Sequence, residues 1–143
     1  MRIHPSEDGG PGLGLCSEAD VVRLVETFYL RVRRDDLLGP FFEARVRDWA
    51  AHHSLLVAFW SSLLRGTRRF HGAPVSCHLG MAGLTEAMFL RWLILFRQTT
   101  ADCDNEAMRR EADAAALRMA NHFWQRYQAR QMPACAPTPL PVD

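Results

Sequence analysis

Histidine is the side chain in this sequence best suited to chemistry, and the six histidines stand in different settings. His52 lies one helical turn before Leu55, Leu56 and Phe59, and His78 follows a loop and precedes an apolar helical segment. A neutral imidazole beside excess bulky apolar residues suggests a metal or cofactor cavity. Taken alone, each of these histidines also fits an ordinary structural role.

The sequence lacks the short motifs of several enzyme classes. It contains no Gly-x-Gly-x-x-Gly, no Gly-Lys-Ser/Thr loop, no Gly-x-Ser-x-Gly and no His-Glu-x-x-His. No pair of acidic residues stands out as an acid–base couple, so no catalytic residue is assigned. The even number of cysteines, four, allows two disulfides, but without a signal peptide or a Cys-x-x-Cys pair we interpret them as free thiols of a cytoplasmic protein.

Composition and charge exclude several partners. The chain has 143 residues, enough for one domain with its own core. Seventeen basic and sixteen acidic residues leave a net charge of +1, which gives no electrostatic footprint for nucleic acid or an anionic membrane. No run of about eighteen apolar residues is present, so no membrane span is expected. We expect a protein without nucleic-acid or membrane partners.

Helical periodicity predicts the elements that position the histidines. A first helix begins after Ser17, which with Asp20 resembles a capping box, and ends before a tight apolar corner at residues 37–42. A second helix runs from near Asp48 to Gly66, with an inward stripe predicted at Leu55, Leu56, Phe59, Trp60 and Leu63.

Two further helices are predicted nearer the C-terminus. One is capped by Thr85 and the other by Asp104 or Asn105, and a short helical turn carries His78. No strand pattern appears, so the class is all-α, with four main helices and one short one. Gly/Pro-rich residues 1–16 and Pro-rich residues 132–143 predict a flexible leader and tail around a domain at 17–131.

Several fragments, in order, resemble the third group of bacterial truncated haemoglobins over roughly residues 18–128. The fragments are Phe28-Tyr29-x-Arg31-Val32-Arg33-x-Asp35, Leu38-Gly39-Pro40-Phe41-Phe42, Trp49-x-x-His52, Phe59-Trp60, Gly72-x-Pro74-x-x-x-His78-Leu79 and Phe89-x-x-Trp92-Leu93-x-Leu95-Phe96. The resemblance implies a truncated globin fold, a two-over-two helical sandwich around haem.

The resemblance also implies roles for particular residues. His78 matches the proximal iron ligand, and the absence of a Cys-x-x-Cys-His motif implies non-covalent haem b. Tyr29 and Trp92 match the distal tyrosine and tryptophan, whose donors would hold a bound diatomic ligand. His52 matches the distal histidine, which would either contact the ligand or swing between pocket and solvent. Alternatively, Tyr29 is a surface residue and Trp92 plain core.

Other residues are expected to line the haem pocket. They are Phe28, Phe42, Leu56, Phe59 and Phe89, with Arg68 and His71 as contacts to the haem propionates. His71 also fits the role of an ordinary polar loop residue. The sequence departs from the family pattern at Phe70, where a tyrosine is common, and it lacks the prolines that some relatives carry after His78.

These features favour a haem protein that binds oxygen, nitric oxide, carbon monoxide or cyanide. Two distal donors favour slow release, and therefore redox chemistry such as nitric oxide detoxification or peroxidase-like turnover. Either reaction requires a separate reductase, because no flavin or nicotinamide domain is recognised, and the protein is expected to be a monomer. The alternatives are oxygen storage or sensing without turnover, and a helical domain that has lost haem and binds a partner.

Overall fold

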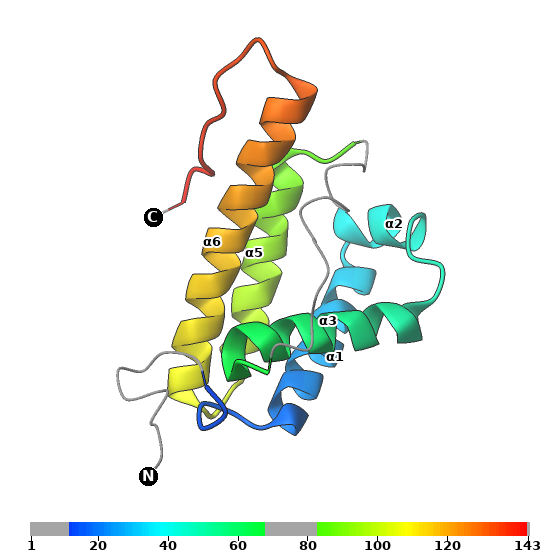
Figure 1. The fold of residues 1–143 in the computed structure, drawn as a ribbon. Coiled ribbons are helices and arrows are strands. Elements are labelled where there is room, and N and C mark those ends of the chain that lie inside the picture. The colour runs from blue at the N-terminus through cyan, green and yellow to red at the C-terminus, as the bar shows by residue number, and fades with distance from the viewer. Residues whose placement is uncertain (1–11, 68–82, 143) are drawn as a thin grey trace.

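The computed structural model describes residues 12–67 and 83–142, and these ranges contain helices and no strand. Helix α1 (Glu18–Arg34) crosses α3 (Trp49–Arg65), and α5 (Glu86–Thr100) runs antiparallel to α6 (Glu106–Gln131) (Figure 1). Helix α1 also packs against α5 and against the short α2 (Leu38–Glu43). The predicted all-α class and its two pairs of helices are therefore confirmed.

Polar caps begin the four long helices where the sequence predicts them. In each case the side chain of the capping residue accepts a hydrogen bond from the backbone N–H three residues later, which satisfies a donor that the helix leaves free. These caps are Ser17, Asp48, Thr85 and Asn105. Gly66 ends α3 with a φ of 67°, a left-handed conformation that favours glycine. Of the two caps considered for α6, Asn105 is correct.

The core lies between the two pairs of helices and is rich in aromatic rings. Trp60 of α3, which the sequence predicts on the inward stripe, stacks on Phe96 of α5 at 5.0 Å between ring centroids. Phe28 of α1 meets Phe96 edge to face at 5.1 Å. These contacts join three helices through one ring, Phe96, which is fully buried.

The predicted apolar corner at residues 37–42 is wrong in detail, because a short helix, α2, forms there. One carboxylate oxygen of Asp35 accepts hydrogen bonds from the N–H groups of Leu37 and Leu38, at 3.0 and 2.9 Å. A Cβ on Gly39 would lie 2.7 Å from the backbone oxygen of Arg33. The close approach of α2 to α1 therefore requires glycine at that position.

Leu55 does not belong to the inward stripe predicted for α3, since it is 52% exposed. The buried face of α3 is made by Trp60, Ser61 and Leu64. At 100° per residue, Leu55 points about 140° away from Trp60, so it faces outward. By the same geometry His53 points within about 20° of Trp60, and His52 about 80° from it.

The described parts of the predicted leader and tail are held against the domain. After α6 the chain turns back and runs beside that helix (Figure 1). Gln128 binds Thr138 through three hydrogen bonds, and Asn121 accepts the N–H of Leu140, which is 3% exposed. The described end of the leader is anchored by a hydrogen bond from Asn105 to the carbonyl of Leu15. Local composition does not register such long-range contacts.

None of the helices in the described ranges is long and apolar enough to cross a membrane.

Candidate functional site

Tyr29 lies at the centre of a cage of rings where α1, α2 and α3 meet. Its own ring is buried, and it lies 4.8 Å from Phe28, 6.0 Å from Phe42 and 5.5 Å from His52, measured between ring centroids. All three contacts are edge to face, an arrangement that aromatic quadrupoles favour. The alternative that Tyr29 is a surface residue is therefore wrong.

Trp92 of α5 joins Tyr29 to the opposite pair of helices. Burial raises the pKa of Tyr29 to about 12, and a hydrogen bond from the Trp92 side chain acts in the opposite direction. The indole N–H can only donate, so the phenol oxygen is the acceptor. Tyr29 thus stays protonated at ordinary pH, and its own O–H remains available to donate to a further group.

Both adjacent histidines of α3 lie beside this phenol. The ring of His52 is 5.5 Å from that of Tyr29, and the ring of His53 is 6.1 Å from it. Of the two, only His52 is expected from the sequence to face the pocket, because the side chains of neighbouring helical residues point about 100° apart. Because the Tyr29 ring projects from α1 toward the first turns of α3, it meets both imidazoles.

Some of the residues expected to line the haem pocket are half-buried, and others belong to the buried core. Phe42, Leu56 and Phe59 are half-buried, as are Met88 and Trp92. Phe28 and Phe89 are buried: Phe28 contacts Trp92 at 5.1 Å, and Phe89 contacts Trp124 of α6 at 5.5 Å. Apolar side chains from α2, α3 and α5 thus remain partly uncovered around the pair of donors, Tyr29 and Trp92. That arrangement fits a flat, largely apolar cofactor such as haem.

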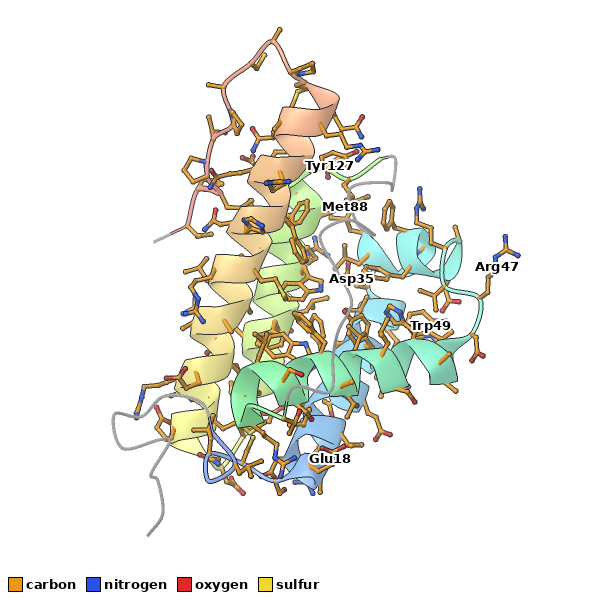
Figure 2. All side chains as sticks on the ribbon, in the orientation of Figure 1. Glu18, Asp35, Arg47, Trp49, Met88 and Tyr127 are labelled. Atoms are coloured by element: carbon orange, nitrogen blue, oxygen red, sulfur yellow. The ribbon has the colours of Figure 1, made fainter. Side chains whose placement is uncertain are left out.

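Three expected site residues, Arg68, His71 and His78, lie outside the described residues. The chain resumes at Gly83, and the N–H of Leu84 donates to the Tyr127 hydroxyl of α6 at 3.2 Å. Tyr127 thereby fixes the point from which α5 departs, and Figure 2 shows it near Met88 at one end of the α5–α6 pair. Within the described ranges, no three His, Cys, Asp or Glu side chains are grouped to hold a metal ion.

Asp35 holds together the elements that carry the donor pair. It follows α1, caps α2, and forms an ion pair with Arg91 of α5 at 2.6 Å. Burial raises its pKa, but the Leu38 N–H, Arg91 and the Leu37 N–H outweigh burial, so the pKa lies below its ordinary value of 3.8. This junction lies close in sequence to both Tyr29 and Trp92, and it fixes how their helices approach each other.

The described cysteines, Cys16, Cys103 and Cys135, are free thiols, in agreement with the sequence interpretation, whereas Cys77 lies outside the described residues. Burial raises the pKa of Cys16 to about 11, so this thiol is a poor nucleophile. These cysteines add no chemistry to the site.

Comparisons with known proteins agree with this geometry. The model of the family described as bacterial-like globin matches residues 13–125. The group 3 truncated hemoglobin ctb of Campylobacter jejuni is 30% identical over 111 residues, which cover 75% of this chain and 87% of the relative. The crystal structure of a group III truncated hemoglobin from the same organism matches with a TM-score of 0.71 and 29% identity. That match covers 78% of this chain and 91% of the other.

Proposed function

Because this chain belongs to the bacterial-like globin family, we propose that it binds haem b non-covalently and uses it for redox chemistry on small ligands. Membership of the family implies haem and a gaseous ligand such as oxygen. The observation that carries the redox proposal is the donor pair formed by the buried Tyr29 and the half-buried Trp92, with His52 beside it.

In this proposal His78 would bind the iron, and the half-buried side chains of Phe42, Leu56 and Phe59 would hold the macrocycle. Arg68 and His71 would bind the propionates. When bound, the haem supplies an iron that coordinates diatomic ligands and exchanges single electrons with a reductase. Hydrogen bonding of the second imidazole nitrogen of His78 would fix its ring.

The donor pair determines what happens to a ligand in the pocket. The Trp92 N–H occupies the oxygen of Tyr29, so the phenol proton is directed to another acceptor. A neutral phenol in a buried site is a strong donor to partial negative charge, since no water competes with it. Tyr29 therefore slows release of a polar diatomic ligand and stabilises charge that develops during its reaction.

Slow release is unsuited to oxygen delivery and favours conversion of the ligand. One candidate reaction joins nitric oxide, oxygen and one electron to give nitrate. The other reduces hydrogen peroxide to water with two electrons and two protons. Both reactions draw electrons from a separate reductase, and the pocket residues supply polarisation and exclude water.

The test combines spectra with kinetics on the haem-loaded protein. We expect a Soret band that His78→Ala abolishes or shifts strongly, and slow oxygen release that Tyr29→Phe accelerates. We also expect the oxygen-loaded protein to consume nitric oxide, or the ferric protein to reduce peroxide, faster than a simple oxygen carrier. Fast oxygen release with neither reaction would contradict the redox role and favour storage. A chain that takes up no haem would overturn the proposal entirely.

A further inference from the structure

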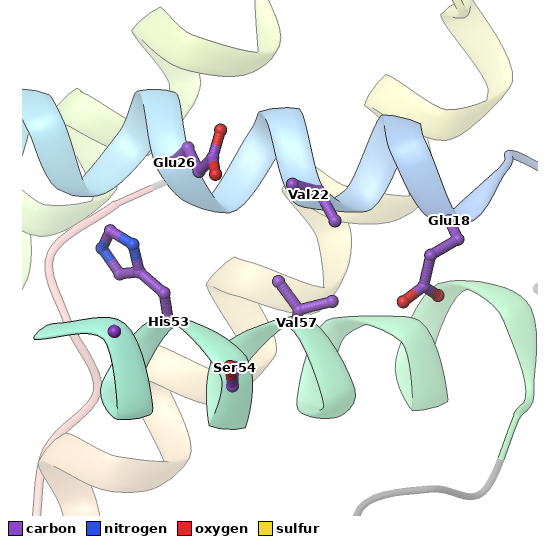
Figure 3. A pocket seen from close by; sticks show the side chains of 7 residues that line it. Glu18, Val22, Glu26, His53, Ser54 and Val57 are labelled. Carbon is purple, nitrogen blue, oxygen red and sulfur yellow. The ribbon is translucent and has the colours of Figure 1, made fainter.

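A groove of about 470 Å³ runs between α1 and α3. Val22 and Val57 line its middle, and polar side chains stand at its two ends (Figure 3). Glu18 lies at one end, where its carboxylate accepts hydrogen bonds from Ser61 at 3.1 Å and Arg65 at 3.2 Å. At that end of the groove, the Glu18 carboxylate therefore links α1 to α3.

The other end of the groove has different chemistry. There the imidazole of His53 and the carboxylate of Glu26 enter from opposite helices (Figure 3). Glu26 is exposed, whereas the Nε2 atom of His53 is shielded from solvent and has no hydrogen-bond partner in the described part of the chain. A buried polar atom without a partner is costly, so Nε2 is poised to bond with a group that reaches it.

The groove has room for water beside the His53 ring, although not against its shielded Nε2 atom. At about 30 Å³ per molecule, its volume holds several waters beside the two ionisable side chains. The other side of the His53 ring lies against the pocket, 6.1 Å from Tyr29 and 5.8 Å from Trp49. His53 is thus a titratable group placed between a polar groove and the buried phenol.

We propose that this groove is a hydrated proton route into the distal pocket, with Glu26 on its outer side and His53 as the proton-relay residue in its inner wall. The inference rests on the peroxide-reducing form of the proposed function, because neither oxygen storage nor the conversion of nitric oxide, oxygen and one electron to nitrate consumes protons. Reduction of hydrogen peroxide by the ascorbate anion takes up one proton from solvent and gives dehydroascorbate and two waters. Two electrons from ascorbate and two protons, one from ascorbate and one from solvent, must therefore reach the pocket.

The charges around His53 suit a relay. Burial lowers the pKa of its imidazole below the ordinary 6.5, Glu26 raises it, and Arg33 lowers it. Arg33 itself forms an ion pair with Glu43, with 2.9 Å between its Nε atom and the Oε2 atom of Glu43. The other ionisable neighbour on α1 is Tyr29, whose pKa of about 12 lets it pass a proton on but not supply one at neutral pH.

The first experiment measures the relay without turnover, by NMR on the haem-loaded carbon monoxide form. Glu26→Gln removes the charge that favours the imidazolium, so the pKa of His53 should fall. His53→Gln should slow solvent exchange of the Trp92 indole proton by about tenfold, a modest part of what a positioned acid–base group contributes. His122→Gln, an exposed histidine of α6, is the matched control and should change neither.

A second experiment follows ascorbate-driven peroxide reduction against pH. The rate should decline as pH rises through the pKa of His53, because the protonated ring is the donor. That decline should move to lower pH in Glu26→Gln and disappear in His53→Gln, with a rate loss of up to about 100-fold. If neither the native protein nor a variant reduces peroxide, the peroxidase form of the proposed function fails, while the NMR results still decide whether His53 relays protons. Unchanged exchange and an unchanged pH profile in His53→Gln would overturn the relay.

Discussion

At the scale of single residues, the pocket depends on two neutral donors that act as a unit. Trp92 donates to the oxygen of Tyr29, and that hydrogen bond aims the phenol proton away from the indole. Phe28 touches both rings, at 4.8 and 5.1 Å, and therefore fixes their relative position. A change to either donor must consequently alter the behaviour of the other.

We expect Trp92→Phe to accelerate oxygen release although Tyr29 remains. Without the indole the phenol loses its partner and its fixed direction, which costs about 1–3 kcal/mol of ligand stabilisation, or roughly a 5- to 150-fold faster release. The pKa of Tyr29 should rise further, because the hydrogen bond that lowers it is lost. Stopped-flow ligand replacement measures the rate. Trp124→Phe on α6 is the control, and equal acceleration there would show that the effect is general loosening.

The residues of the site differ in how far the sequence could identify them. Tyr29, Trp92 and His52 could be singled out because their spacing follows a known family pattern. His53 could not, because its importance comes from the direction in which the Tyr29 ring projects, and that direction depends on how α1 crosses α3. Helical periodicity shows which residues share a face of one helix, but it does not show how two helices cross.

At the scale of elements, Asp35 is the junction on which the pocket's geometry depends. Its carboxylate is 9% exposed and binds two N–H groups at the start of α2 and Arg91 of α5. Arg91 is 40% exposed, so the ion pair itself contributes little after solvent screening. The stabilisation comes mainly from the capping bonds, which hold α2 at a fixed angle to α1.

We expect Asp35→Ala to lower the free energy of unfolding by about 1–2 kcal/mol at pH 6, measured by urea denaturation. The folded pKa of Asp35 lies below 3.8, so its contribution is complete above that pH and is lost as pH falls through the folded value. The difference from the native protein should therefore shrink near pH 3. Asp36→Ala, the exposed neighbour, should have little effect at either pH, and a deficit for Asp35→Ala that does not change with pH would contradict this account.

The elements differ in how far they could be predicted. The starts of the four long helices could be predicted because Ser17, Asp48, Thr85 and Asn105 act within their own turn. The short α2 could not, because it has only six residues, two of them Gly39 and Pro40, which are typical of turns, and it is held by contacts with α1 and α5. Signals confined to one turn are visible in sequence, whereas a helix fixed by tertiary contacts is not.

At the scale of the whole molecule, both described ends of the chain complete the core. Leu15 and Leu140 belong to the same buried cluster as Tyr29 of the pocket and Trp60 of the core, although both leucines lie in segments whose composition predicts disorder. A single buried leucine contributes as much as several surface contacts, so a Pro-rich segment can be ordered by one side chain and a few hydrogen bonds.

We therefore expect Leu140→Ala to destabilise the whole domain and not merely to free its C-terminal segment. Truncating a buried leucine costs 2–5 kcal/mol, and we expect about 2 because a chain end shifts easily to fill a cavity. For a protein of this size, that loss corresponds to a melting temperature lower by about 4–8 °C, measured by calorimetry. Val142→Ala, at a position 39% exposed, should leave the melting temperature nearly unchanged. If instead Leu140→Ala leaves the melting temperature unchanged and only increases proteolysis after residue 131, the segment is an attachment that the core does not require.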